Sequence, residues 1–83
     1  MTEQDRKRRN SLLATLAFAG QSVARELRNE LESVHGLAVT LDRVNADLRA
    51  LADLGAVRFD PASGVAQITL EGREHVQRLR ELF

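Results

Sequence analysis

The sequence predicts a small α+β fold in which three helices precede a two-stranded β-hairpin and a fourth helix follows it. Apolar residues recur at spacings of three and four up to Leu54, which is the helical period. After Gly55 the period changes to two on both sides of a turn, and helical spacing returns after Thr69. With 83 residues, the chain has material for one hydrophobic core, so a single domain is expected.

Residues 1–9 are polar throughout and predict a flexible basic arm in front of a domain that spans 10–83. The arm contains four consecutive basic residues, Arg6, Lys7, Arg8 and Arg9. Two interpretations stay open. The arm is a frayed, solubilising tail, or it lies along the phosphates of DNA.

The first helix is expected to begin near Arg9 or Asn10 and to run to Ala19, where Gly20 ends it. Its apolar stripe consists of Leu12, Leu13, Leu16 and Ala17, with Phe18 beside it. Ser22 is a suitable N-cap for the second helix, which Gly36 ends. The stripe of that helix consists of Val23, Ala24, Leu27, Leu31 and Val34. The short segment 37–39 is apolar and is expected to pair with the later hairpin.

The third helix covers 41–54, with Thr40 as its N-cap and Gly55 after its end. One face is apolar and carries Leu41, Val44, Leu48 and Leu51. The opposite face carries Arg43, Asn45, Ala46, Asp47, Arg49 and Ala50. Such a helix can enter the major groove of DNA, and it is equally consistent with an ordinary solvated surface.

Strands are expected over 57–60 and 65–69, because apolar and polar residues alternate there around the turn-forming residues 60–64. Thr69 caps a last helix that runs to Leu82. Its stripe is Val76, Leu79 and Leu82, with Phe83 at the end. Three helices followed by a β-ribbon form the winged helix-turn-helix arrangement. The core is thin, so a homodimer would bury more surface, and the last helix is the candidate contact.

Composition restricts the function. The formal net charge is zero, which counts against strong nucleic-acid binding without forbidding it. There is no cysteine, and the two histidines lie far apart in sequence, so no metal site or cofactor is expected. We find no nucleophile elbow, no phosphate-binding loop and little room for a ligand pocket, so no enzyme is expected. Without a signal peptide or membrane span, the chain is expected to be cytoplasmic.

Two motifs resemble known sequences. Leu48-x-x-Leu51-x-x-x-Gly55-x-Val57 resembles the end of the recognition helix and the first wing strand of bacterial winged-helix regulators of the MarR, PadR and ArsR kinds. The stretch 68–73, Ile-Thr-Leu-Glu-Gly-Arg, resembles the point where their second wing strand passes into the last helix. The stretch 35–57 is also similar to small winged-helix proteins of Mu-like prophages.

The resemblance implies a transcriptional regulator that binds double-stranded DNA. By position, the residues that would face the groove are Arg43, Asn45, Ala46, Arg49 and Ala50. Arg58 and Ser63 would be wing contacts. Three features depart from the pattern: the second and third helices are connected by a longer segment, the third helix has a net charge of −1, and the wing tip has no base. An alternative is therefore a protein-interaction module, such as a phage-derived adaptor without significant DNA affinity.

Overall fold

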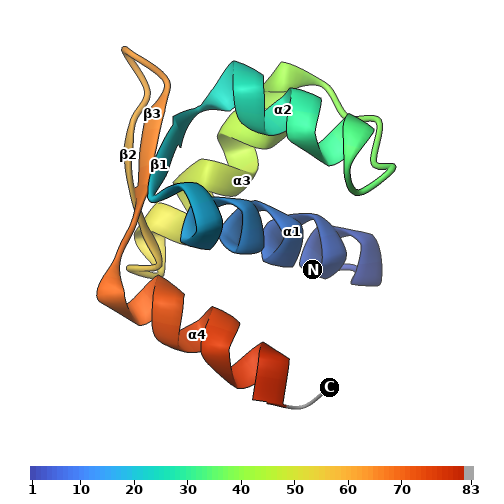
Figure 1. Ribbon diagram of the computed structural model, residues 1–83. Helices are drawn as coiled ribbons and strands as arrows, with labels where there is room; N and C mark the ends of the chain where they lie inside the picture. The colour runs from blue at the N-terminus through green and yellow to red at the C-terminus, as the bar shows by residue number, and fades with distance from the viewer. Residues whose placement is uncertain (82–83) are drawn as a thin grey trace.

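Residues 1–81 form four helices and a three-stranded antiparallel sheet in the predicted winged helix-turn-helix arrangement (Figure 1). The computed structural model describes residues 1–81, and Leu82 and Phe83 lie outside the described residues. The elements in chain order are α1 (Glu3–Ala19), β1 (Gln21–Val23), α2 (Ala24–Ser33), α3 (Leu41–Asp53), β2 (Val57–Asp60), β3 (Val65–Ile68) and α4 (Leu70–Glu81). None of these helices is long and apolar enough to cross a membrane.

The sheet contains a strand that the sequence did not predict. Its order is β1-β3-β2, and β3 pairs with β2 from Val57↔Ile68 to Asp60↔Val65, as expected for the hairpin. The third strand is β1, which pairs with β3. The segment 37–39 had been expected in that position, and it is not a strand. Gly20, at φ 85°, turns the chain out of α1 so that β1 begins at once.

Helix α2 also begins differently from the prediction. Ser22 lies inside β1, and the N-cap is Val23, which makes no side-chain capping bond. The backbone N–H of Ala24 instead donates to the carbonyl oxygen of Gly64 at 2.8 Å. The start of α2 is therefore attached to the turn between β2 and β3. A local sequence pattern cannot predict such a contact between distant residues.

The core is built from aliphatic side chains of the four helices and of strands β2 and β3. Its buried members are Leu12, Leu13, Leu16, Ala24, Leu27, Leu31, Val44, Leu48, Leu51, Val57, Ala66, Ile68 and Val76. Val34, predicted as part of the apolar stripe of its helix, is 66 % exposed, so that prediction was wrong. Phe18, expected beside the stripe of α1, is 93 % exposed. Both lie close to the ends of their helices, where the apolar stripe no longer faces a neighbouring element.

Helix α1 begins at Glu3, so the expected arm over residues 1–9 is wrong for most of its length. Thr2 and Asp5 form a capping box: the Thr2 hydroxyl oxygen accepts from the Asp5 N–H, and the Asp5 carboxylate accepts from the Thr2 N–H, both at 3.1 Å. These bonds satisfy backbone donors of the first turn. The Thr-x-x-Asp spacing was a visible signal for this start.

The junction between β3 and α4 explains the motif at 69–73. The Thr69 hydroxyl donates to the Gly55 carbonyl oxygen at 2.6 Å and accepts from the Gly72 N–H at 3.1 Å, so Thr69 caps α4 as predicted. A Cβ atom on Gly72 would collide with the carbonyl oxygen of Ala56. Arg73 Nη1 donates to the Ala17 carbonyl oxygen at 3.0 Å. Thr69 and Gly72 thus hold the start of α4 against the connection between α3 and β2, and Arg73 holds it against α1, so the motif serves packing.

Candidate nucleic-acid interface

Helix α3 presents a polar surface opposite the side chains that anchor it. Its buried apolar residues are Val44, Leu48 and Leu51. The Thr40 hydroxyl oxygen accepts from the Arg43 N–H at 3.2 Å and caps the first turn, as predicted. Of the residues expected to face the groove, Arg43, Ala46 and Arg49 are exposed, and Asn45 and Ala50 are half-buried.

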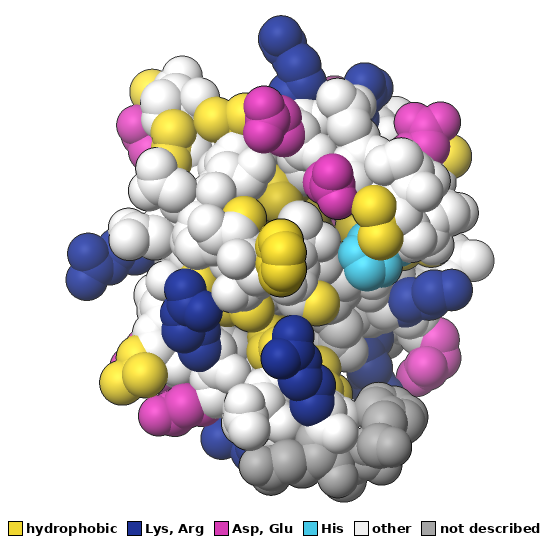
Figure 2. Space-filling view, in the orientation of Figure 1, with side chains coloured by type: hydrophobic (Ala, Val, Ile, Leu, Met, Phe, Trp, Pro, Cys, Tyr) yellow, Lys and Arg dark blue, Asp and Glu magenta, His cyan; other side chains and the backbone are white. Residues whose placement is uncertain are grey.

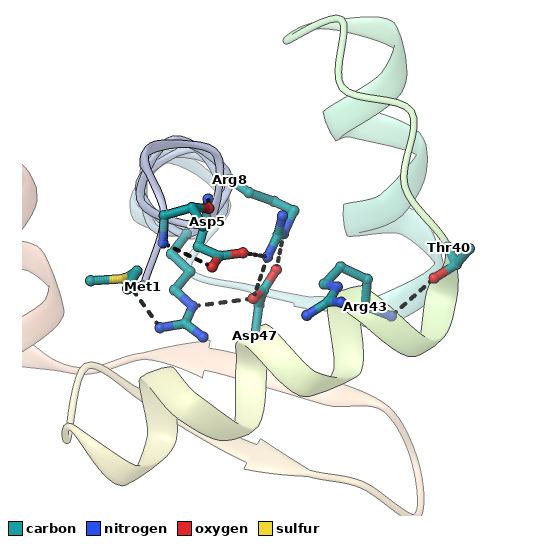
Figure 3. Close-up of polar contacts among 8 residues, drawn as sticks. Met1, Asp5, Arg8, Thr40, Arg43 and Asp47 are labelled. Atoms are coloured by element: carbon teal, nitrogen blue, oxygen red, sulfur yellow. Dashed lines mark hydrogen bonds and ion pairs between the residues drawn. The ribbon is translucent and has the colours of Figure 1, made fainter.

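Asp47 does not belong to that surface, and its predicted outward position is wrong. The side chain is fully buried and faces α1, where it accepts hydrogen bonds from two arginines (Figure 3). Arg8 donates through Nε and, at 3.0 Å, through Nη2; Arg9 donates through Nε at 3.1 Å. Asp47 follows Val44 by three positions and precedes Leu51 by four, so its place on the buried side was visible in the spacing.

The buried carboxylate engages half of the four-residue basic run. Arg8 is only 8 % exposed, and its Nη2 also donates to Asp5 at 2.6 Å. The hydrogen bonds to Asp47 and Asp5 raise the pKa of Arg8, while the Thr2 N–H and the Arg8 guanidinium lower the pKa of Asp5. Arg8 therefore does not fit the predicted phosphate contact, because it is already bound within the fold.

The other members of the run differ from one another. Arg6 is exposed and forms an ion pair with Glu3 at 3.2 Å. The Arg9 side chain is 25 % exposed and lies beside Arg8 on Asp47. Lys7 is exposed, and no ion pair of its side chain is recorded within residues 1–81. Lys7 and Arg6 are thus the residues of this run that remain accessible to a partner.

Burial of Asp47 changes the charge that α3 shows to solvent. The predicted net charge of −1 counted three aspartates against two arginines. With Asp47 paired inside, the exposed charges are Asp42 and Asp53 against Arg43 and Arg49, which balance. Arg43 lies one turn before Asp47, on the same side of the helix (Figure 3). Arg49 follows Asp47 by two positions, so it points to a different side of α3, and it is exposed.

The first turn of α3, the wing turn and the start of α2 enclose a shallow hollow of about 500 Å³. Asn45 and Ser63, which were predicted separately as a groove and a wing contact, both line it. Arg25 lines it as well and was not among the residues predicted to contact DNA. Glu26 is the acidic residue of the lining. Together these four side chains form a polar surface that joins α3, the wing turn and the start of α2.

The wing turn is held by Asp60. Its carboxylate accepts from the Ser63 hydroxyl at 2.8 Å and from the Ala62 N–H at 3.1 Å. These bonds, first the one from Ser63, lower the pKa of Asp60. The Ser63 oxygen also accepts from the Val65 N–H at 3.3 Å, so its hydroxyl serves the turn.

Arg58 lies apart from that hollow. It is exposed on β2 opposite Gln67, and it borders a second hollow together with Thr69, Leu70 and Glu71, at the base of the wing. The structure thus brings Asn45 and Ser63 together and leaves Arg58 near the start of α4.

Each histidine has a neutral neighbour. His35 Nε2 lies 3.3 Å from the Thr15 hydroxyl, and His75 Nε2 lies 3.4 Å from the Asn10 side-chain oxygen. Within residues 1–81, no three His, Asp or Glu side chains are grouped so that they could hold a metal ion.

Comparison with protein-family models gives no match, and comparison with curated proteins gives none either. Among solved structures, the chain is similar to F93 from STIV, described as a winged-helix DNA-binding protein. The TM-score is 0.74 at 19 % sequence identity, over 89 % of this chain and 84 % of that one. At this identity the likeness concerns the fold, and the predicted winged helix is confirmed. The likeness to MarR, PadR, ArsR and prophage proteins stays a resemblance.

Proposed function

We propose that the chain is a DNA-binding winged-helix protein that places α3 in the major groove and acts as a transcriptional regulator. The fold supports this proposal, since the similar structure F93 is described as a DNA-binding protein. The exposed surface of α3 supports it too, because small residues at Ala46 and Ala50 let the helix approach base edges. Arg49 and Asn45 supply side chains of the types that recognise guanine and adenine.

The observation that carries the proposal is the hollow shared by α3, the wing turn and α2. Asn45, Ser63 and Arg25 come from three elements and line one surface. A duplex that is held by α3 would bring its phosphates against the flanking elements, where Arg25 offers a positive charge. Phosphate contacts position the protein, and contacts from α3 to bases would provide the specificity.

The balanced charge of α3 removes one objection to this function. The prediction of an acidic helix motivated the alternative without DNA binding. Because Arg8 and Arg9 neutralise Asp47 inside the fold, that carboxylate does not repel a phosphate at the surface. The exposed arginines of α3 are then matched, not exceeded, by exposed aspartates.

An amide-resolved NMR titration with a mixed-sequence duplex at low salt tests the proposal. We expect shifts concentrated over residues 43–50, at Arg25 and in the wing turn. These shifts should be reversed by salt, since phosphate contacts weaken steeply between about 50 and about 200 mM salt. A spectrum that does not change, also with a panel of duplexes of differing sequence, would overturn the DNA-binding function.

We also infer a homodimer that forms through α4. Leu70 on this helix is 69 % exposed, and a core made only of aliphatic side chains gains from further burial. Sedimentation equilibrium over a range of concentrations tests this inference. A monomer mass at every concentration would refute it, as would a dimer that persists after Leu70→Glu.

A protein-interaction module is the second candidate function, and Phe18 is the observation that favours it. The ring is 93 % exposed beside a groove of about 680 Å³ between α1 and α2, with Glu26 and Glu30 along its lining. Hydrophobic side chains reach the surface over α1 on this face (Figure 2). Duplex affinity that falls steeply with salt would exclude a function restricted to protein contacts.

A further inference from the structure

A further hollow, of about 410 Å³ and distinct from those beside the wing, lies between α1, the end of α3 and α4. Its size is typical of small-molecule sites, so the expectation of little room for a ligand was wrong. The lining has two chemical parts. Leucines from three helices supply its apolar part, namely Leu13, Leu51, Leu54 and Leu79. Guanidinium groups supply most of its charge, from Arg6, Arg9 and Arg78.

We propose that this hollow binds a small amphipathic carboxylate, such as a medium-chain aliphatic acid. Three arginines and one acid, Glu71, line it. Arg6 is paired with Glu3 and Arg9 with Asp47, so an anion would bind through the guanidinium donors that these pairs leave free. A guanidinium binds a carboxylate through two parallel, charge-assisted hydrogen bonds, which are stronger than bonds to a neutral acceptor. The leucines require an apolar tail, because an anion without one would leave that surface unused.

Arg9 is the residue on which the proposal depends most. Its Nη1 atom lies 3.3 Å from the thioether sulfur of Met1, and thioethers are weak acceptors. A carboxylate oxygen would replace that sulfur as a much stronger partner for the guanidinium. The Arg9 side chain is also one-quarter exposed, so a ligand in the hollow can reach it.

The same guanidinium connects the hollow to α3. Arg9 Nε donates to Asp47 Oδ1 at 3.1 Å, and Asp47 lies between Val44 and Leu51 on the anchored side of the helix. A carboxylate at Nη1 shares this guanidinium with Asp47, which accepts from Nε, and draws it toward the hollow. Occupation of the hollow therefore changes the attachment of the proposed recognition helix to α1, and the site is a candidate effector site for that helix.

Titration of the free protein with sodium octanoate, followed by amide NMR, tests the site. The measurement uses no DNA, so its outcome is independent of the proposed DNA-binding function. We expect saturable shifts at Leu13, Leu51 and His75, which line the hollow, and at Asp47 through Arg9. Octan-1-ol, which has the same tail and no charge, should bind about three- to fivefold more weakly, the effect of one partly exposed ion pair. Acetate, which lacks the tail, should produce no saturable shifts.

Arg78→Gln provides the variant, and Arg80→Gln is the matched control on the same helix outside this hollow. The first should weaken octanoate binding about three- to fivefold, and the second should leave it unchanged. Absence of saturable shifts would overturn the proposal. Equal affinities for octanoate and octanol, or equal effects of the two variants, would also overturn it, because the arginines would then have no part in binding. Shifts that spare Asp47 would remove the connection to α3.

Discussion

Arg8 of α1 and Asp47 of α3 form a buried ion pair between residues 39 positions apart (Figure 3). Two bonds from the Arg8 guanidinium reach the carboxylate, a geometry that fixes both partners in one orientation. Asp5 accepts a further bond from Arg8, so the first turn of α1 belongs to the same network. The pair therefore sets how α3 is rotated against α1, and with it which side chains of α3 face outward.

Replacement of Asp47 by alanine should destabilise the protein strongly. Arg8 and Arg9 would then remain largely buried without the carboxylate that they share. Removal of one partner of a buried ion pair typically costs about 3–5 kcal/mol. We expect a loss in the free energy of unfolding near the lower end, about 3 kcal/mol, because both arginines keep some access to water. Urea denaturation measures it.

Asp53→Ala is the control for this experiment, since Asp53 is an exposed aspartate on the same helix. Its effect should stay within about 0.5 kcal/mol, as for most surface substitutions. The double variant Arg8→Met, Asp47→Leu should recover part of the loss, because it removes both charges of the pair and leaves apolar side chains in their place. Equal stability of Asp47→Ala and Asp53→Ala would show that the pair does not fix α3.

Arg49→Ala should weaken duplex binding by about 1–3 kcal/mol, the usual effect of losing one arginine contact to a base. Its side chain is exposed and makes no recorded hydrogen bond within residues 1–81, so the free energy of unfolding should hardly change. Fluorescence anisotropy with a labelled duplex gives the affinity. Arg43→Ala is expected to act in the same direction. Arg80→Ala, on α4, is the control, and an equal effect of Arg80→Ala would place DNA elsewhere.

Gly72→Ala should destabilise the protein by about 1–3 kcal/mol, the range for an overfilled site. Alanine ordinarily favours a helix over glycine by about 1 kcal/mol, so destabilisation would mean that packing prevails over propensity. The new methyl group would collide with the backbone of Ala56 and with Ile68, and backbone yields little. Thermal unfolding of Gly72→Ala beside Gln77→Ala, at an exposed position of α4, measures the difference. Equal melting temperatures would contradict the close approach.

The sequence predicted the architecture well because periodicity reports which side of each element is buried. The hairpin, its turn and the Thr69 cap were all placed correctly. The prediction failed where contacts between residues far apart in the sequence determine the structure. Strand β1 has three residues and depends on pairing with β3, more than forty positions away, which no local pattern shows.

The site was predicted less completely, for a related reason. Helical spacing places Asp47 on the buried side of α3, but Arg8 taken alone looks like a surface residue, and only their mutual contact makes burial of the two charges favourable. Arg25 became part of the candidate surface because α2 starts against the wing turn. Helical periodicity within one segment shows neither the Arg8–Asp47 pair nor the contact between α2 and the wing turn. The exposed positions of α3 were therefore predicted more successfully than the residues of other elements that lie beside them.

Acidification should loosen the wing turn only at a pH below the ordinary pKa of an aspartate. Bonds from the Ser63 hydroxyl and the Ala62 N–H lower the pKa of Asp60 in the folded state from its usual 3.8. The unfolded chain therefore binds protons first as the pH falls, and the contribution of Asp60 to stability, complete above the unfolded pKa, is lost as the pH falls through the folded pKa. The carboxyl carbon shift of Asp60 measures the folded value directly. In Ser63→Ala the largest cause is removed, so the midpoint should rise toward 3.8 and the acid loss of stability should shrink. An identical midpoint in both proteins would mean that the Ser63 hydroxyl does not hold this carboxylate in solution.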